Sequence, residues 1–293
     1  MSAPIFVRFW GTRGSIPTPG HKTRRFGGNT SCVEIRSGES ELVCDGGTGL
    51  RELGLELLQR RQPPRSVHLF FSHMHWDHIQ GFPFFVPAYA PENELTVYDP
   101  GSGRVEELLH GQMRSDYFPV NFSDLGAKIR TRHFEAETAR VDDFEVRCFE
   151  QAHPGRSFGY AFELGGKKIV YATDSELDRL LVNRDETERD AEKLRRLPSE
   201  LVACVAGADL LIADGQYTDA EYPKKVGWGH ARANTVVDLA HQAGVKQCAI
   251  FHHDPLHSDE LVDQKIAAAK ARLAARGSST LVFGAREGLE LKF

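Results

Sequence analysis

The segment HMHWDH at residues 73–78 places three imidazoles and a carboxylate within six positions. It directly follows a short apolar run that predicts a buried strand, so these side chains are expected at one edge of a sheet. His73 and His75 are two positions apart, and a turn can direct both toward one ion. Asp77 and His78 are offset from them and can serve a second ion. Imidazoles and carboxylates are common ligands of divalent metals. The motif therefore predicts a metal site at the end of this strand.

Composition excludes several classes of chain. The 293 residues are 41% hydrophobic and 26% charged, which is ordinary for a folded protein and unlike a disordered, collagen-like or coiled-coil chain. The net charge of −5 argues against a protein that grips long nucleic acid through a basic face. Five cysteines without a C-x-x-C pair predict buried, reduced thiols. With no signal-peptide pattern and no apolar run of about 18 residues, we expect a cytoplasmic protein without a membrane partner.

The hydrophobic pattern predicts an α/β fold. Short strand patterns dominate the first part of the chain, and one helix pattern spans 50–61. Strands and helices alternate later, with helices expected at 233–244 and 259–276 and a charged surface helix or insertion at 183–200. No linker, repeat or low-complexity tract marks a boundary. We expect a single domain over residues 1–293 with a central pair of sheets.

His-x-His-x-Asp-His after a strand resembles the signature of the metallo-β-lactamase fold, a four-layer αβ/βα sandwich of metal-dependent hydrolases. The resemblance extends over most of the chain, because three later strand-end residues match the rest of the family's ligand set: His153, Asp174 and His252. It implies that the first metal is held by His73, His75 and His153, and the second by Asp77, His78 and His252. Asp174 then bridges both ions together with a hydroxide.

Two points about this ligand set follow from the residues themselves. Imidazole and carboxylate ligands suit zinc, manganese or iron. With the two metal positions that the resemblance implies, we expect two divalent ions, zinc or manganese, as cofactors. His252 and His253 are adjacent and only one can point into the site; we favour His252, which comes one residue past the apolar run. Asp45 matches an early strand-end aspartate of the family, and we expect it to hold the ligand loop by hydrogen bonds.

The segment Gly227-Trp228-Gly229-His230-Ala231 indicates a branch of this family. It resembles the Gly-His-Ser motif of ribonuclease Z and its small-molecule relatives, with alanine in place of serine. The resemblance implies that His230 lies beside the scissile phosphate and protonates the leaving alkoxide; the alternative is a loop histidine that caps the next helix. His230 and the metal ligand Asp77 are the catalytic candidates. Segments 10–15 and 27–32 are similar to the subgroup that contains cyclic-nucleotide phosphodiesterases.

The sequence thus predicts a dinuclear metal-dependent hydrolase that cleaves a small phosphodiester, for example a cyclic nucleotide, by attack of a bridging hydroxide. We expect no long nucleic acid as a partner, and a homodimer by resemblance only. Three alternatives stay open: an RNA 3′-processing nuclease similar to ribonuclease Z, a thioesterase or lactonase, and a metal-site sensor that binds a nucleotide without cleaving it. The aromatic segment 82–89, after the motif, is either a stacking surface for a nucleobase or plain core.

Overall fold

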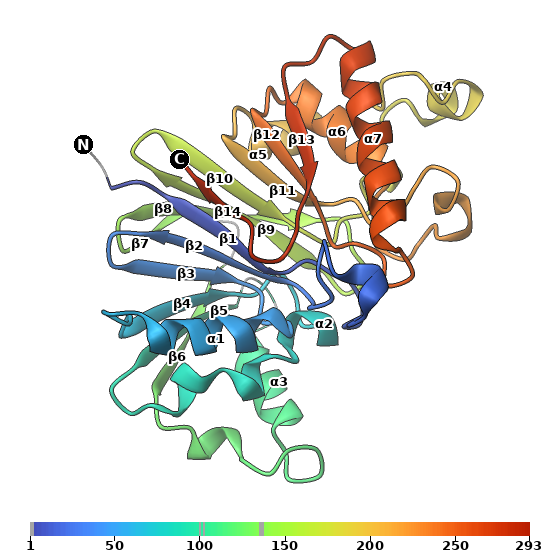
Figure 1. Cartoon of the computed structure of the whole chain (residues 1–293). Helices are drawn as coiled ribbons and strands as arrows, with labels where there is room; N and C mark the ends of the chain where they lie inside the picture. The colour runs from blue at the N-terminus through green and yellow to red at the C-terminus, as the bar shows by residue number, and fades with distance from the viewer. Residues whose placement is uncertain (1–2, 100, 102, 135–137) are drawn as a thin grey trace. The chain divides into compact units, whose positions relative to one another are not determined.

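Strands of the chain pair into two mixed seven-stranded sheets in the computed structural model, which describes residues 3–99, 101, 103–134 and 138–293. The chain divides into two compact units, each built on one of these sheets: a first unit of residues up to 137 together with 286–293, and a second unit of 138–285 (Figure 1). The predicted pair of sheets is therefore present.

The first-unit sheet has the order β14-β1-β2-β3-β4-β5-β6. Its pairs from β14 to β3 are antiparallel, whereas β3, β4, β5 and β6 are parallel neighbours. Parallel strands place their carboxyl ends at one edge of a sheet, which is where ligands gather in such folds. The strands are β1 (Phe6–Gly11), β2 (Cys32–Ser37), β3 (Ser40–Cys44), β4 (Ser66–Phe70), β5 (Glu94–Asp99), β6 (Lys128–His133) and β14 (Glu290–Lys292).

Helix α1 (Gly49–Gln59) packs against β1 and β2 of this sheet, and α3 (Val105–Gln112) packs on β5. The leucine spacing predicted α1, and Leu50, Leu53 and Leu57 are indeed buried in the first-unit core. The remaining helices here are short: α2 (Trp76–Ile79) and the 3-10 turns η1 (His21–Thr23), η2 (Phe82–Phe84), η3 (Val86–Tyr89) and η4 (Phe122–Asp124).

The aromatic segment 82–89 is mostly core. Phe82 and Phe85 are fully buried in the first-unit cluster, while Phe84 is half exposed and meets Phe118 edge to face. Burial of this apolar surface stabilises the unit through the hydrophobic effect. Of the two interpretations of this segment, Phe82 and Phe85 therefore fit the hydrophobic core and not a stacking surface.

The second-unit sheet has the order β13-β12-β11-β10-β9-β8-β7, with β10 to β13 parallel and β7 to β10 antiparallel. Gly165 and Gly166 form the turn that joins β9 and β10, and both have the positive φ that a tight hairpin requires. The strands are β7 (Thr138–Val141), β8 (Phe144–Gln151), β9 (Ser157–Leu164), β10 (Lys167–Ala172), β11 (Leu210–Asp214), β12 (Gln247–Phe251) and β13 (Leu281–Gly284).

Helix α6 (Ala233–Gln242) packs on β11 and β12, and α7 (Asp259–Ala275) packs on α6 and β13 (Figure 1). The Ser258 hydroxyl caps the start of α7, and Gly277 follows its end with a φ of 61°. The charged segment expected as one helix or surface insertion at 183–200 is only partly helical: it holds the short helix α4 (Arg184–Arg189), an irregular stretch and the first two residues of α5 (Ser199–Val205). The second unit also contains the 3-10 turns η5 (Leu177–Arg179) and η6 (Tyr222–Lys224).

Two smaller expectations concern the cysteines and membrane spans. All five cysteines are free, and four are buried while Cys204 is partly exposed. Among the described residues, the longest helices are either too short or too polar to cross a bilayer.

Candidate metal centre

Asp45 organises the first-unit ligand loop. It follows β3, and Ser72 and His73 follow the neighbouring parallel strand β4. The carboxylate of Asp45 accepts the Ser72 backbone N–H at 2.7 Å, the Ser72 hydroxyl at 2.8 Å and His78 Nδ1 at 2.7 Å. Because the Ser72 hydroxyl proton is directed to Asp45, Ser72 Oγ accepts from His73 Nδ1 at 3.0 Å. The expectation that Asp45 holds this loop by hydrogen bonds is confirmed.

Asp77 and the three histidines of the motif lie close to one another in the first unit. The Asp77 carboxylate accepts the Ser15 backbone N–H at 2.7 Å and lies 3.3 Å from His78 Nε2. The His73 ring is 4.4 Å from the His75 ring, edge to face, and 4.3 Å from the His78 ring. His75 is exposed at the start of α2, whereas the other three side chains are buried. The motif residues therefore form a compact cluster of ligand atoms.

The second-unit candidates come from the carboxyl ends of three neighbouring parallel strands. Asp174 follows β10, Asp214 ends β11 and His252 follows β12, so the sheet brings them to the same edge. Asp174 has a φ of 41° and His252 a φ of 56°, and Asp45 in the first unit has a φ of 59°. Such left-handed backbone in non-glycine residues costs about 1–3 kcal/mol each and concentrates at functional sites.

His252 rather than its neighbour faces the acidic cluster. His252 Nδ1 donates to Gln216 Oε1 at 2.9 Å, and His252 Nε2 lies 3.2 Å from an Asp174 oxygen. His253 instead contacts the backbone carbonyl of Ala285 through Nε2 at 2.9 Å. Both rings are fully buried. This is the arrangement that the position of His252 past the apolar run predicted.

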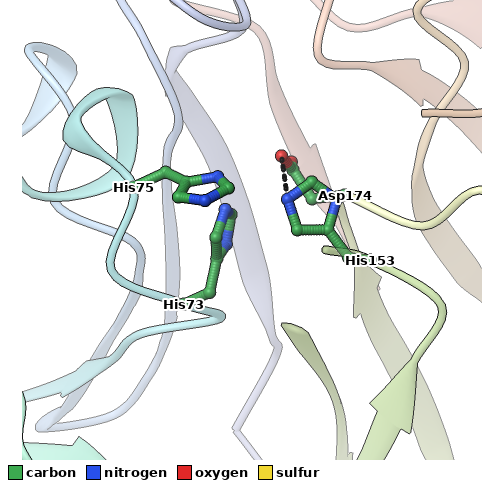
Figure 2. A group of neighbouring side chains, drawn as sticks. All are labelled: His73, His75, His153 and Asp174. Carbon is green, nitrogen blue, oxygen red and sulfur yellow. Dashed lines mark ion pairs between the residues drawn. The ribbon is translucent and has the colours of Figure 1, made fainter. Parts of the chain in front are cut away.

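His153 lies against Asp174 and against the loop Gly227–Gly229 of the second unit. Its Nε2 is 3.9 Å from an Asp174 oxygen, the ion pair drawn in Figure 2, where His73 and His75 of the first unit are also shown. Its Nδ1 donates to the Gly229 carbonyl at 2.9 Å. Burial lowers the pKa of His153 below its ordinary value, although Asp174 and the Gly229 carbonyl oppose this shift. The neutral imidazole is the form that binds metal, so the direction of this shift is compatible with His153 as a ligand.

His230 forms a dyad with Asp214. His230 Nδ1 lies 2.9 Å from Asp214 Oδ2, and the ring stacks on His252 at 4.9 Å between centroids. Asp214 is itself fixed, because one of its oxygens accepts the Gln216 backbone N–H at 3.0 Å. Asp174, Asp214, His230 and His252 each offer a ligand atom within 4.8 Å of the others. His230 is therefore oriented by a carboxylate, at a place where both proton transfer and cation binding are chemically feasible.

Sequence reasoning missed Glu176, which braces the loop before His230. Its carboxylate is only 1% exposed and accepts the Gly227 N–H at 2.7 Å, the Gly229 N–H at 3.0 Å and the Tyr222 hydroxyl at 2.9 Å. Its own N–H donates to Ala152, the residue before His153, at 2.6 Å. Asp214 and Gln216 were also not assigned roles. An acid at the end of the buried strand 208–214 was a usable signal for Asp214, whereas nothing local marked Glu176.

The donor set suits divalent metal ions. The histidines His73, His78, His153 and His252 share one pattern: each directs Nδ1 to an oxygen acceptor. For three of them Nε2 lies beside an aspartate, at the distances given above. Acceptors of this kind fix the ring and leave Nε2 as the ligand atom, the usual design around metal-bound histidine. The residues present therefore fit imidazole- and carboxylate-bound metal.

A model of the family described as "Beta-lactamase superfamily domain" matches residues 41–253. The chain belongs to this superfamily, and all the candidate site residues fall within the matched range. The predicted metallo-β-lactamase fold class, an αβ/βα sandwich, is confirmed.

Among its relatives is the ribonuclease Z of Haloarcula marismortui, which is 24% identical over an alignment of 296 positions that covers 88% of this chain and 90% of that protein. Among solved structures, the metallo-β-lactamase fold protein YhfI from Bacillus subtilis covers 99% of this chain and 100% of its own, with a TM-score of 0.68 and 18% identity. The structure of a diphosphatase of the PhnP family covers 99% of this chain and 98% of its own chain, with a TM-score of 0.67 and 16% identity.

These relatives confirm the predicted resemblance to the phosphodiesterase branch and the predicted class of enzyme, a hydrolase. One expectation is not supported. The net charge of −5 led us to expect no long nucleic acid as partner, yet the relative above is named a ribonuclease. Net charge averages over the whole surface and does not report a local binding site.

Proposed function

We propose that this protein is a dinuclear metal-dependent phosphodiesterase. By resemblance to the family, two divalent ions would be held by residues of one catalytic domain: His73, His75, Asp77, His78, His153, Asp174 and His252. The observation that carries the proposal is the common orientation of the buried histidines, each with Nδ1 on an oxygen acceptor and Nε2 left for metal.

Two bound ions would supply hydroxide at neutral pH and electrostatic stabilisation of the phosphate oxygens. The chain's own residues then have separate tasks. Asp45 holds His73, through Ser72, and His78 in the ligand orientation. Gln216 and the Gly229 carbonyl do the same for His252 and His153. Asp77 is kept in place by the Ser15 N–H. Such hydrogen bonds pre-organise ligands so that no rearrangement is needed at the moment of reaction.

His230 acts as the general acid. Asp214 holds Nδ1–H and stabilises the protonated imidazole, which leaves the Nε2 proton for the departing alkoxide. Such general acids typically contribute about 10²- to 10⁴-fold to the rate. The substrate is then a phosphodiester whose leaving group is an alcohol, as in a cyclic nucleotide.

The proposal is tested by a turnover panel on protein reconstituted with Zn²⁺ or Mn²⁺. The substrates are bis(p-nitrophenyl) phosphate, 2′,3′- and 3′,5′-cyclic nucleotides, a precursor tRNA and a glutathione thioester, with Asp174→Ala as the inactive control. We expect metal-dependent cleavage of a phosphodiester that the control loses. Turnover of the thioester alone would overturn the proposal, and tight nucleotide binding without product would indicate a sensor.

RNA 3′-end processing is the second candidate, supported by the ribonuclease Z relative that aligns with 88% of this chain. The same chemistry serves both substrates. Cleavage of the precursor tRNA with a strong fall in activity at higher salt, and faster than any cyclic nucleotide, would favour the nuclease.

A further inference from the structure

The loop from Lys225 to His230 presents an exposed indole beside the second-unit site. Trp228 is 58% exposed although it lies two residues before His230, which is buried. A tryptophan ring stabilises a folded protein most when its large apolar surface is buried. The loop thus keeps a large apolar ring in solvent next to the proposed reaction centre.

The loop is held rigidly in this position. Gly227 and Gly229, on either side of Trp228, both donate their N–H groups to the buried Glu176. Both have positive φ, of 87° and 91°. A Cβ on Gly229 would lie 2.2 Å from His153 Nδ1, so the backbone of the loop is packed directly against that ring. The backbone on both sides of Trp228 is therefore held in place next to His153, and the indole it carries is exposed.

A cation accompanies the indole. Lys225 Nζ lies 3.9 Å from the centre of the Trp228 ring and 5.7 Å from that of Tyr217. Tyr217 in turn meets His230 edge to face at 5.9 Å. A positive charge over an aromatic face is a favourable contact, and it covers one face of the indole. An exposed ring with an ammonium beside it suits a ligand that is both aromatic and anionic.

We propose that Trp228 and Lys225 form a nucleotide subsite, in which the indole stacks on a nucleobase of the substrate and the ammonium pairs with a phosphate oxygen. Stacking on an aromatic side chain suits every base, because each has a π-face. This subsite makes the proposed function more specific, because it assigns the substrate to the nucleotides. It rests on the proposed function for the statement that the bound nucleotide is cleaved, whereas nucleotide binding itself does not depend on it. Binding of a nucleotide can be measured without turnover.

The test compares two probes that share a sugar and a phosphate and differ in the base: adenosine 5′-monophosphate and ribose 5-phosphate. Dissociation constants are measured by calorimetry on the metal-loaded wild type and on Trp228→Ala, Trp228→Phe and Lys225→Gln. Val226→Ala is the matched control, because Val226 is 57% exposed in the same loop and carries no ring.

We expect the wild type to prefer the base-bearing probe and Trp228→Ala to weaken its binding by about 5- to 150-fold, with a much smaller effect on ribose 5-phosphate. Trp228→Phe retains most of the preference, and Lys225→Gln weakens both probes together. In turnover, Trp228→Ala raises KM for a cyclic nucleotide more than it lowers kcat.

Equal binding of the two probes by the wild type, or an equal loss of both in Trp228→Ala, would overturn the subsite even if phosphodiesters are cleaved. A base preference that depends on Trp228 in a protein that cleaves no phosphodiester would support the subsite while contradicting the proposed function. The two failures are therefore distinguishable.

Discussion

At the scale of single residues, the site depends on which oxygen each histidine nitrogen faces. His230 faces Asp214, whereas His153 and His252 face uncharged oxygens of Gly229 and Gln216. A carboxylate stabilises a protonated imidazole much more than an amide or a backbone carbonyl does. This difference separates the proposed proton donor from the two proposed histidine ligands of the second unit; in the first unit the proposed ligand His78 also faces a carboxylate, that of Asp45.

Replacing Asp214 with asparagine should lower turnover of a phosphodiester by about 10²-fold, because the amide no longer stabilises the protonated His230. Metal content, measured by elemental analysis after dialysis, should stay at the wild-type level, as it should in His230→Ala. Asp209→Asn is the control: Asp209 is a buried carboxylate just before the other end of β11, where it binds Lys167 and Lys246. Loss of metal from Asp214→Asn or His230→Ala would place those residues among the ligands.

The candidate ligands were easier to recognise in the sequence than the residues that hydrogen-bond to them. His-x-His-x-Asp-His, His153, Asp174 and His252 were recognisable because the residue types are characteristic and follow apolar runs. Their acceptors Ser72, Gln216 and the Gly229 carbonyl carry no such mark. These contacts arise only when strands distant in the sequence lie side by side.

Glu221 gives a pH dependence at this scale. Burial raises the pKa of Glu221, but hydrogen bonds from the Thr218 N–H and from His257 lower the pKa by more than that. The net result is a pKa of about 2. The ordinary value is 4.5, so the unfolded chain takes up the proton first as the pH falls. The contribution of the ionised Glu221 to the stability of the folded protein is therefore complete above pH 4.5, and it is lost as the pH falls through about 2.

We therefore expect wild type to be more stable than Glu221→Gln in urea unfolding at pH 7, and the difference to shrink steadily when the pH is lowered from 4.5 toward 2. A difference that is constant over this range, or that grows, would show that the carboxylate charge is not what stabilises the 218–221 turn.

At the scale of elements, the segment after β10 connects the parts of the second-unit site. Asp174, Glu176 and Asp178 follow one another at alternate positions, and each serves a different partner. Asp174 faces the histidines, Glu176 holds the Gly227–Gly229 loop, and Asp178 accepts the Arg232 N–H at 2.9 Å at the start of α6. One strand end thereby positions the whole connection from β11 to α6.

The variant Glu176→Gln should weaken metal binding about tenfold and lower kcat. The amide NH₂ cannot accept the Gly229 N–H, so the loop moves and its carbonyl leaves His153 Nδ1. Metal affinity is measured by competition with a chelator, and circular dichroism confirms folding.

Tyr222→Phe is the matched control for this experiment. It removes the third hydrogen bond of Glu176 and leaves both glycine bonds in place. We expect metal affinity near that of wild type in this variant. Wild-type affinity in a folded Glu176→Gln protein would contradict the positioning role.

Prediction of the elements themselves succeeded where the apolar pattern was long. Helices α1, α6 and α7 and most strands of both sheets were predicted from hydrophobic spacing and from glycine and proline signals. The four-residue strand β7, the seven-residue helix α5 and the eight-residue helix α3 were not predicted. Short elements of this kind form because a neighbouring strand or helix pairs with them, and their own sequence carries little signal.

At the scale of the whole molecule, each unit has its own buried core and its own sheet, and the cysteines report on that packing. Burial raises the pKa of Cys148 and of Cys248 to about 12, and it raises those of Cys32 and Cys44 as well. Thiols with raised pKa values carry little thiolate and react slowly. Cys204 is the partly exposed cysteine.

We expect one thiol per chain, Cys204, to react quickly with Ellman's reagent at pH 8 in the native protein, and all five to react in urea. The variant Cys204→Ser should abolish the fast phase. Rapid reaction of two or more thiols in the native protein would show that a core is more open than the structure indicates.

The central claim is that two metal ions cleave a phosphodiester, and the most direct measurement is a metal titration of the chelator-treated protein followed by activity on bis(p-nitrophenyl) phosphate. The account predicts no turnover without metal, two equivalents of Zn²⁺ or Mn²⁺ bound per chain, and activity that rises with occupancy and is absent in Asp174→Ala. Undiminished turnover after removal of metal, or full activity in Asp174→Ala, would contradict it.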